Sequence, residues 1–276
     1  MDIDVLRSTL GCAAERVRAE KPLAGSVTNG VTMDFVANSQ LAAGGSAAMV
    51  YLPDEAERLV NVGGALYLNM GTLLPVYEQT IPTAAAAARR AGKPWVVDPV
   101  GIGIGALRAR LLADLKDDKP TIIRGNASEI IALATLWGLG GDAGTGPLGV
   151  DSVDEVEAAR AAAVALARWT GGAVAVSGVC DLVTNGQVVA RCQGGSALME
   201  KVTGFGCSLG GVTAVYAACA DPFAAATAAV VLYNIAGARA ATRTTLPASF
   251  KVAFIDELAA AIPADIAEGP LTLEEV

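Results

Sequence analysis

The chain contains no histidine, and this absence removes whole classes of catalytic site. Without histidine there is no Ser-His-Asp triad, and the five cysteines include no C-x-x-C pair, so the usual zinc sites are also excluded. A P-loop is missing as well, because the only Gly-Lys pair, Gly92-Lys93, runs into Pro94. Any chemistry must therefore use carboxylates, a thiol, backbone amides or a bound cation.

Positive charge is scarce. The 20 Lys and Arg residues face 28 Asp and Glu residues, the net charge is −8 and no basic stripe exists, so we expect no nucleic-acid partner. The most apolar stretch, 209–236, consists mainly of small residues and is divided by Asp221-Pro222 into two helices, so we expect no membrane partner. The N-terminal residues Met1 to Asp4 lack the features of a signal peptide. These observations predict a cytoplasmic protein.

The 276 residues fit one large domain, 1–276, built from alternating strands and helices. The predicted helices are 4–20, 53–60, 75–91, 108–115, 128–137 and 153–169. The predicted strands are 48–50, 65–69, 95–98, 121–124 and 173–176. This alternation indicates an α/β fold with a mainly parallel central sheet, helices on both faces and an α-helical C-terminal third. The loose stretch 138–149 is predicted to be a surface loop.

Asn185-Gly186 between two apolar runs predicts a hairpin with a two-residue turn. In that register Thr184 faces Gln187, and Cys180 faces Arg191. Cys192 then points to the opposite face from Cys180. The hairpin therefore argues against a disulfide between the two cysteines.

Four loops with polar or glycine-rich tips directly follow predicted strands. They are Asn69-Met70-Gly71-Thr72, Asp98-Pro99-Val100-Gly101, Arg124-Gly125-Asn126 and Ser177-Gly178. Ligands of open parallel sheets bind at the carboxyl ends of the strands. We therefore expect these loops to meet at one rim and to form the functional site.

The glycine-rich segment Gly204 to Gly211 leads into an apolar helical run. Its free amides and the helix dipole suit a phosphate group. The alternative is that the glycines only let a helix pack closely, and the same alternative applies to Gly101, Gly103 and Gly105. From this segment alone the two interpretations are about equal.

Three side chains near these loops each allow two interpretations. Asp98 could hold a hydrated Mg²⁺ or cap loop amides. Glu129 could do the same or form a capping box with Asn126. Cys207 could be a base whose pKa is lowered by the helix N-terminus, or a small buried hydrophobe. The two carboxylates beside an anion loop favour a metal and a nucleotide.

At this point the chain resembles the hydroxyethylthiazole kinases of thiamine salvage, a family of the ribokinase-like superfamily. The similar blocks, over about residues 20 to 250, are Thr28-Asn29-x-Val31-Thr32-Met33-x-x-x-Ala37-Asn38, Asn69-x-Gly71-Thr72, Asp98-Pro99-Val100-Gly101, Ile123-Arg124-Gly125-Asn126-Ala127-Ser128-Glu129, Gly149-Val150-Asp151-Ser152 and Val202-Thr203-Gly204-x-Gly206-Cys207-Ser208.

The resemblance implies a ribokinase-like fold and ATP-dependent phosphorylation of the primary alcohol of 4-methyl-5-(2-hydroxyethyl)thiazole. It implies a homotrimer with active sites at subunit interfaces. It places ATP on Arg124, Ser177 and Asn126, with Mg²⁺ on Asp98 and Glu129. It places the thiazole near Met49, Gly204, Asn29 and Val31. The amides of Gly204, Phe205, Gly206 and Cys207 would receive charge on the phosphoryl group, and Cys207 resembles the general base of related kinases.

Phe205 and Ser177 stand where the family usually has threonine, and Gly195-Ser196 where Gly-His is common. A ring in the anion loop would alter the substrate or the turnover. Two alternatives therefore remain: a kinase of another small alcohol, such as a hydroxymethylpyrimidine, and a degenerate member that binds a thiazole or nucleotide without turnover.

Overall fold

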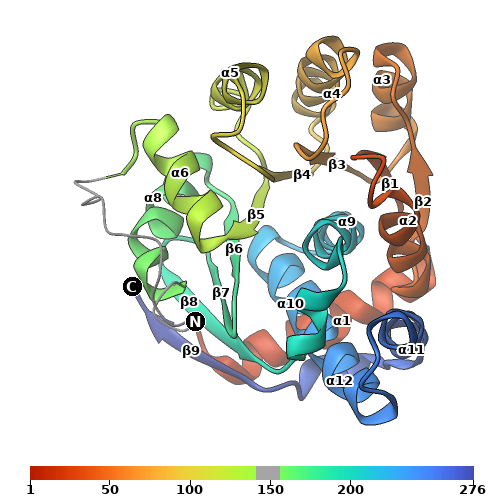
Figure 1. Cartoon of the computed structure of the whole chain (residues 1–276). Helices are drawn as coiled ribbons and strands as arrows, with labels where there is room; N and C mark the ends of the chain where they lie inside the picture. Colours follow the sequence, from red (N-terminus) through yellow and green to blue (C-terminus); the bar gives the residue numbers. More distant parts are fainter. Residues whose placement is uncertain (141–155) are drawn as a thin grey trace.

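The computed structural model of the chain describes residues 1–140 and 156–276, which form one sheet with helices on both faces (Figure 1). The strand order is β2-β1-β3-β4-β5-β6-β7-β8-β9. The strands are β1 Leu23–Val27, β2 Ser46–Met49, β3 Ala65–Asn69, β4 Trp95–Asp98, β5 Ile122–Asn126, β6 Ala173–Ser177, β7 Cys180–Thr184, β8 Val188–Gln193 and β9 Leu271–Glu275. β1 to β6 run parallel, and β7 to β9 continue the sheet antiparallel.

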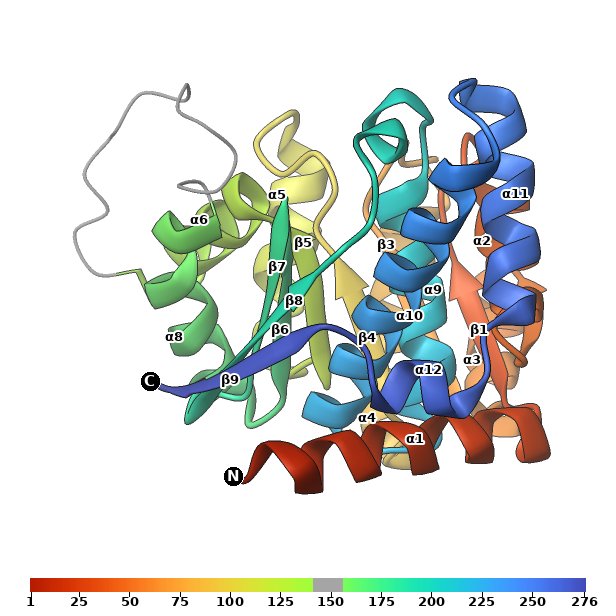
Figure 2. The ribbon, with the colours of Figure 1, turned by 90° about the horizontal axis from the view of Figure 1, so that it is seen from below.

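The helices divide between the two faces of the sheet (Figures 1 and 2). One face carries α3 Pro53–Val62, α4 Tyr77–Ala91, α5 Ala106–Asp114, α6 Ala127–Leu136 and α8 Arg160–Thr170. The other carries α1 Ile3–Glu20, α2 Met33–Ala42, α9 Phe205–Ala217, α10 Pro222–Arg243, α11 Pro247–Ala260 and α12 Pro263–Ala267, with the 3-10 helix Ala197–Lys201 before α9. The predicted mainly parallel sheet with a helical C-terminal third is confirmed.

The central strands agree best with the sequence. β3 and β4 have the predicted bounds, and all their residues are buried, as expected for strands covered by helices on both sides. The sequence did not assign β1, α2 or β9. β1 is made of small residues that favour no element strongly, and Gly25 lets Leu59 of α3 approach so closely that a Cβ there would lie 2.6 Å from its side chain.

The hairpin of β7 and β8 forms, but its predicted register is wrong by two residues. Thr184 pairs with Val189 and Cys180 with Gln193. The turn is longer because the Asn185 side chain accepts hydrogen bonds from the amides of Gln187 and Val188. A shift of two keeps every side chain on its face, so Cys180 and Cys192 still point apart, and both are free thiols.

Asp221-Pro222 separates α9 from α10 as predicted, with Asp221 capping the amides of Phe223 and Ala224. Among the described residues α10 is the one helix long and apolar enough to cross a membrane, but 83% of its apolar window is buried inside the fold. α10 is therefore a core helix here. Residues 141–155 lie outside the described ranges, and with them lie most of the predicted 138–149 loop, the block at 149–152 and the start of the helix predicted at 153–169.

Candidate active site

The four predicted loops meet at one rim, because the strands that carry them are neighbours. β3, β4, β5 and β6 are adjacent and parallel, and their register places Asn69 opposite Asp98 and Asn126 opposite Ser177. In Figure 2 the first turn of α9 lies at the same end of the molecule, while α1 crosses the opposite end. The rim therefore combines strand-end polar groups with a helix N-terminus.

Asp98 is fully buried at the end of β4 and only one of its oxygens is occupied. Its Oδ2 accepts hydrogen bonds from Tyr67 Oη at 3.0 Å and Asn69 Nδ2 at 3.3 Å, and pairs with Arg124 Nη1 at 3.5 Å. Its Oδ1 is buried and has no hydrogen-bond partner in the described protein. Burial, with the nearby Glu129 charge, raises the pKa of Asp98 to about 6 despite Arg124. A buried carboxylate oxygen without a partner raises the free energy of the folded state, so Oδ1 is suited to bind a cation or a proton.

Arg124 lies in β5 rather than in the loop after it, and its guanidinium reaches across the neighbouring strand ends. Nη2 donates to Ser177 Oγ at 2.7 Å, while Nη1 faces Asp98. The guanidinium also lies against the first turn of α9, where a Cβ on Gly206 would be 2.5 Å from Nη1. Glycine at 206 therefore allows a buried positive charge beneath the helix N-terminus.

A chain of buried amide groups joins Asp98 to Cys207. Asn69 Nδ2 donates to Asp98, and Asn69 Oδ1 accepts from Asn29 Nδ2 at 2.8 Å. Asn29 Nδ2 also lies 3.6 Å from Cys207 Sγ, a distance at which the thiol accepts a weak hydrogen bond. The residues that the sequence assigned to metal and to base are thus held in one network.

The expected lowering of the Cys207 pKa is wrong. Burial of the thiol, with the neighbouring Asp98 charge, raises its pKa above the usual value, and Arg124 opposes this only in part. The sequence argument counted the helix N-terminus and missed the depth of the side chain, which is only 9% exposed. At neutral pH the group is mainly a thiol.

The start of α9 has the geometry of an anion site. Gly204 has a φ of +97°, a conformation that favours glycine, and a Cβ there would lie 2.9 Å from Thr32. The first three residues of α9 are Phe205, Gly206 and Cys207. Among the described residues, no group accepts a hydrogen bond from their backbone amides. Free amides and the positive end of the helix dipole, beside Arg124, suit a phosphoryl group.

The other glycines of this segment serve packing, as the alternative interpretation held. A Cβ at Gly210 would lie 2.5 Å from the ring of Tyr67, and one at Gly211 would lie 2.7 Å from Val36. α9 can therefore press against β3 and α2. This close approach is what brings Tyr67 and Asp98 beneath the first turn of the helix.

Phe205 does not place a ring in the anion loop, contrary to the expectation from sequence. Its side chain is 6% exposed and packs edge-on against Phe35 of α2 and Phe254 of α11, with ring centroids 4.9 and 4.7 Å away. Only its backbone amide remains at the rim. The Phe205 ring points away from the anion loop because it packs into an apolar cluster formed by other helices. The local sequence does not reveal that cluster.

Asn126 and Glu129 form the predicted capping box. Asn126 Oδ1 accepts from the Glu129 amide, and Glu129 Oε2 accepts from the Asn126 amide, both at 2.9 Å. Glu129 Oε1 also accepts from the Gly101 amide at 3.3 Å, which links the box to the loop after Asp98. The box leaves the carboxylate of Glu129 near Asp98, and its charge adds to the effect of burial in raising the pKa of Asp98.

Of the residues that the resemblance places near the thiazole, Met49, Asn29 and Val31 lie at the ends of β1 and β2, and Gly204 is the N-cap of α9. Met49 ends β2 opposite Ser26, and Val31 lies in the turn after β1 with 64% of its surface exposed. Asn29 is buried, and its side chain is occupied by Asn69, Cys207 and the amides of Val31 and Thr32. Asn29 therefore positions Asn69 and Cys207, and its side chain has little hydrogen-bonding capacity left for a ligand.

Tyr67 is a site residue that the sequence argument missed. Its hydroxyl donates to Asp98 and accepts from Asn69 Nδ2 at 2.8 Å. A signal was available, since Tyr67 and Asn69 are two apart in a strand and so share a face. A buried strand tyrosine two residues before a polar strand end indicates a partner for its hydroxyl.

The donors at the rim fit Mg²⁺ better than a softer metal. The unpaired Oδ1 of Asp98 and the Glu129 carboxylate are oxygen donors, which Mg²⁺ prefers. No three His, Cys, Asp or Glu side chains come together as a metal cage in the described ranges. That agrees with Mg²⁺ sites that use one or two carboxylates plus phosphate oxygens and water.

Known proteins agree with this geometry. The hydroxyethylthiazole kinase family profile matches residues 14–263. The chain is 48% identical to the hydroxyethylthiazole kinase of Bifidobacterium longum, covering 98% of this chain and 92% of that protein. It is 45% identical to that of Cereibacter sphaeroides, covering 94% and 97%.

Solved structures extend the comparison. A hydroxyethylthiazole kinase from Pyrococcus horikoshii superposes with a TM-score of 0.86 at 30% identity, over 98% of this chain and 99% of that one. Staphylococcus aureus pyridoxal kinase in complex with ADP shares the fold alone, with a TM-score of 0.56 at 17% identity over 79% and 88% of the two chains. With nearly the whole length matched in sequence and structure, the chain belongs to the hydroxyethylthiazole kinase family.

Proposed function

We propose that this protein transfers the γ-phosphoryl group of ATP to the primary alcohol of 4-methyl-5-(2-hydroxyethyl)thiazole in the presence of Mg²⁺. The observation that carries the proposal is the buried network that joins the half-occupied carboxylate of Asp98 to Cys207 beneath the open first turn of α9. Phosphoryl transfer depends on positioning and on neutralising charge, and this arrangement supplies both. Family membership adds the class of substrate.

Each group at the rim then has a role. Asp98 and Glu129 would hold Mg²⁺, which when bound would offset the charge of the phosphates. Arg124, with Ser177 and Asn126, would bind the nucleotide, and the amides of Gly204, Phe205, Gly206 and Cys207 would donate to the transferring phosphoryl oxygens. Cys207 would act in its thiolate form: after losing its own proton to solvent, Sγ would take the proton of the attacking hydroxyl, while Asn29 and Asn69 hold the side chain in place.

The thiazole would bind beside Met49, Asn29 and Val31 at the ends of β1 and β2, and beside Gly204 at the start of α9. Val31 is 64% exposed in the single chain, which suits a residue covered by ligand or by a second subunit. The homotrimer with active sites at subunit interfaces rests on the family resemblance and stays a prediction. The cytoplasmic location stays a prediction.

The buried position of Phe205 weakens the argument for a degenerate member that binds without turnover. The anion loop keeps its open amides, so nothing in the ring's placement blocks a phosphoryl group. The hydroxymethylpyrimidine alternative is decided by substrate, not by fold, because both reactions would use the same phosphoryl machinery.

A coupled assay for ADP release tests the proposal. The protein is given ATP, a Mg²⁺ titration, and either the hydroxyethylthiazole or a hydroxymethylpyrimidine. We expect turnover with the thiazole alcohol that rises from near zero with Mg²⁺. Faster turnover of the pyrimidine would favour the alternative kinase, and nucleotide binding with neither alcohol consumed would favour the degenerate member.

A further inference from the structure

One arginine at the rim has no acidic partner and no role in the site described so far. Arg108 lies in the first turn of α5, which begins after the loop that follows Asp98. A cation there is repelled by the partial positive charge at the N-terminus of the helix, and the first turn of α5 contains no acidic residue that would compensate. A guanidinium in this place is electrostatically unfavourable unless an anion is bound nearby.

The position of Arg108 is fixed by two neighbouring strand ends. Its Nε donates to the Met70 carbonyl at 2.7 Å, in the loop after β3. Its guanidinium also packs on Gly101, where a Cβ would lie 3.5 Å from Cζ. The Gly101 amide in turn donates to Glu129. One edge of the guanidinium is therefore held against the loops that carry Asn69 and Asp98, and its terminal nitrogens have no hydrogen-bond partner among the described residues.

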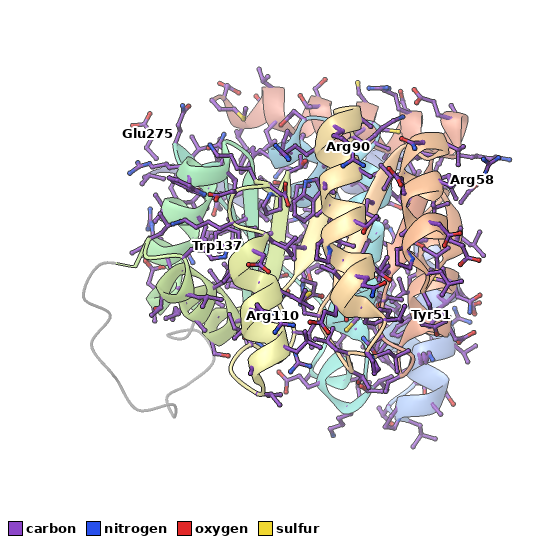
Figure 3. The ribbon with its side chains drawn as sticks, turned by 90° about the horizontal axis from the view of Figure 1, so that it is seen from above. Tyr51, Arg58, Arg90, Arg110, Trp137 and Glu275 are labelled. Atoms are coloured by element: carbon purple, nitrogen blue, oxygen red, sulfur yellow. The ribbon has the colours of Figure 1, made fainter. Side chains whose placement is uncertain are left out.

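The neighbouring arginines differ in this respect. Arg110, on the same helix, pairs with Glu78 of α4, and Arg90 pairs with Glu57 of α3. Figure 3 shows Arg110 near the same end of the molecule as Tyr51, and Arg90 near the other end. Arg124 is already engaged by Ser177 and Asp98. Among the described residues at this rim, Arg108 is thus the guanidinium whose terminal nitrogens are free, and it lies against the loops that follow β3 and β4.

We propose that Arg108 binds the polyphosphate of the nucleotide, as a second guanidinium beside Arg124. Even with Mg²⁺ bound, a triphosphate would bring more negative charge to the rim than a helix N-terminus and an arginine already paired with Asp98 would offset. A guanidinium fixed through Nε keeps its two terminal nitrogens in the fork geometry that phosphate oxygens favour. This inference rests on the proposed use of ATP.

The test compares Arg108→Ala and Arg108→Gln with Arg110→Ala as the matched control. Binding of ATP with Mg²⁺ and of AMP is measured by calorimetry for each protein. Arg108→Ala is expected to weaken ATP binding by about 10- to 100-fold, the range for a hydrogen bond to a charged group, and AMP binding far less. Arg108→Gln keeps an amide donor for Met70 and removes the charge, so it should behave like Arg108→Ala while retaining the melting temperature.

Arg110→Ala should leave the dissociation constants of ATP and AMP within about twofold of the wild-type values. Arg110 forms only an exposed ion pair with Glu78, and such pairs contribute little to stability. Equal losses for ATP and AMP would overturn the proposal, since they would show that Arg108 only supports the loop. Unchanged ATP binding in Arg108→Gln would overturn it as well. If the wild-type protein itself fails to bind ATP, the proposed function fails before Arg108 is tested.

Discussion

Replacing Cys207 separates the chemical role of the thiol from its packing role. Cys207→Ala removes one buried sulfur atom, whose hydrogen bond from Asn29 Nδ2 at 3.6 Å is weak. A loss of about 1 kcal/mol or less in the free energy of unfolding is expected, which is small beside the stability of a domain. Folding should therefore survive the substitution.

The effect on turnover should be much larger. Loss of a general base lowers kcat by about 10²- to 10⁴-fold, equivalent to about 3 to 5 kcal/mol in the activation free energy. Cys207→Ser nearly preserves the volume but is a far weaker acid, so it should be almost as slow as the alanine variant. Cys207→Asp supplies a carboxylate and should retain turnover, while losing stability because a second buried acid then lies near Asp98.

The raised pKa of Cys207 gives the pH dependence. A base acts only when deprotonated, and a raised pKa leaves little thiolate at neutral pH. The kcat of the wild-type protein should therefore rise with pH through the neutral and mildly alkaline range. Cys207→Asp should lack this rise over the same range.

The assay is kcat at saturating ATP, Mg²⁺ and thiazole alcohol, with the melting temperature measured for each variant. Cys219→Ala is the control, because Cys219 is also buried but lies near Glu20, outside the site. An alanine variant at position 207 within about tenfold of wild type, with a normal melting temperature, would refute the base role.

Two further predictions concern buried or linked carboxylates. Glu129→Gln keeps an acceptor for the capping box, so helix α6 should still form. Its kcat should fall sharply at limiting Mg²⁺ and recover at high Mg²⁺, because the carboxylate charge is lost. An unchanged dependence of kcat on Mg²⁺ would leave Glu129 with the capping role alone. Burial raises the pKa of Asp181 from 3.8 to about 6, so its neutral form stabilises the fold and this contribution is lost as pH rises from 3.8 to 6. Relative to wild type, Asp181→Asn should therefore become more stable by about 2 kcal/mol between pH 4 and pH 7, and denaturant unfolding that gives the same difference at both pH values would contradict this.

The sequence by itself determined the features that depend on local patterns. Continuous apolar runs predicted β3 and β4. The pair Asn126 and Glu129 predicted a capping box, and Asp221-Pro222 predicted the start of α10. Polar groups directly after buried strands predicted the rim. These features follow from hydrogen bonding and periodicity over a few residues, so neighbours along the chain suffice to specify them.

Only the tertiary structure decided where the individual side chains point and how deeply they lie. Phe205 packs among rings from α2 and α11, Cys207 has a raised pKa because it is buried beside Asp98, and Asn29 meets a thiol 178 residues away. Burial and charge at a site depend on partners distant in sequence, and no local pattern reports them. The sequence thus indicated the candidate groups of the site, and the packing of α9 against β3 fixed their environment.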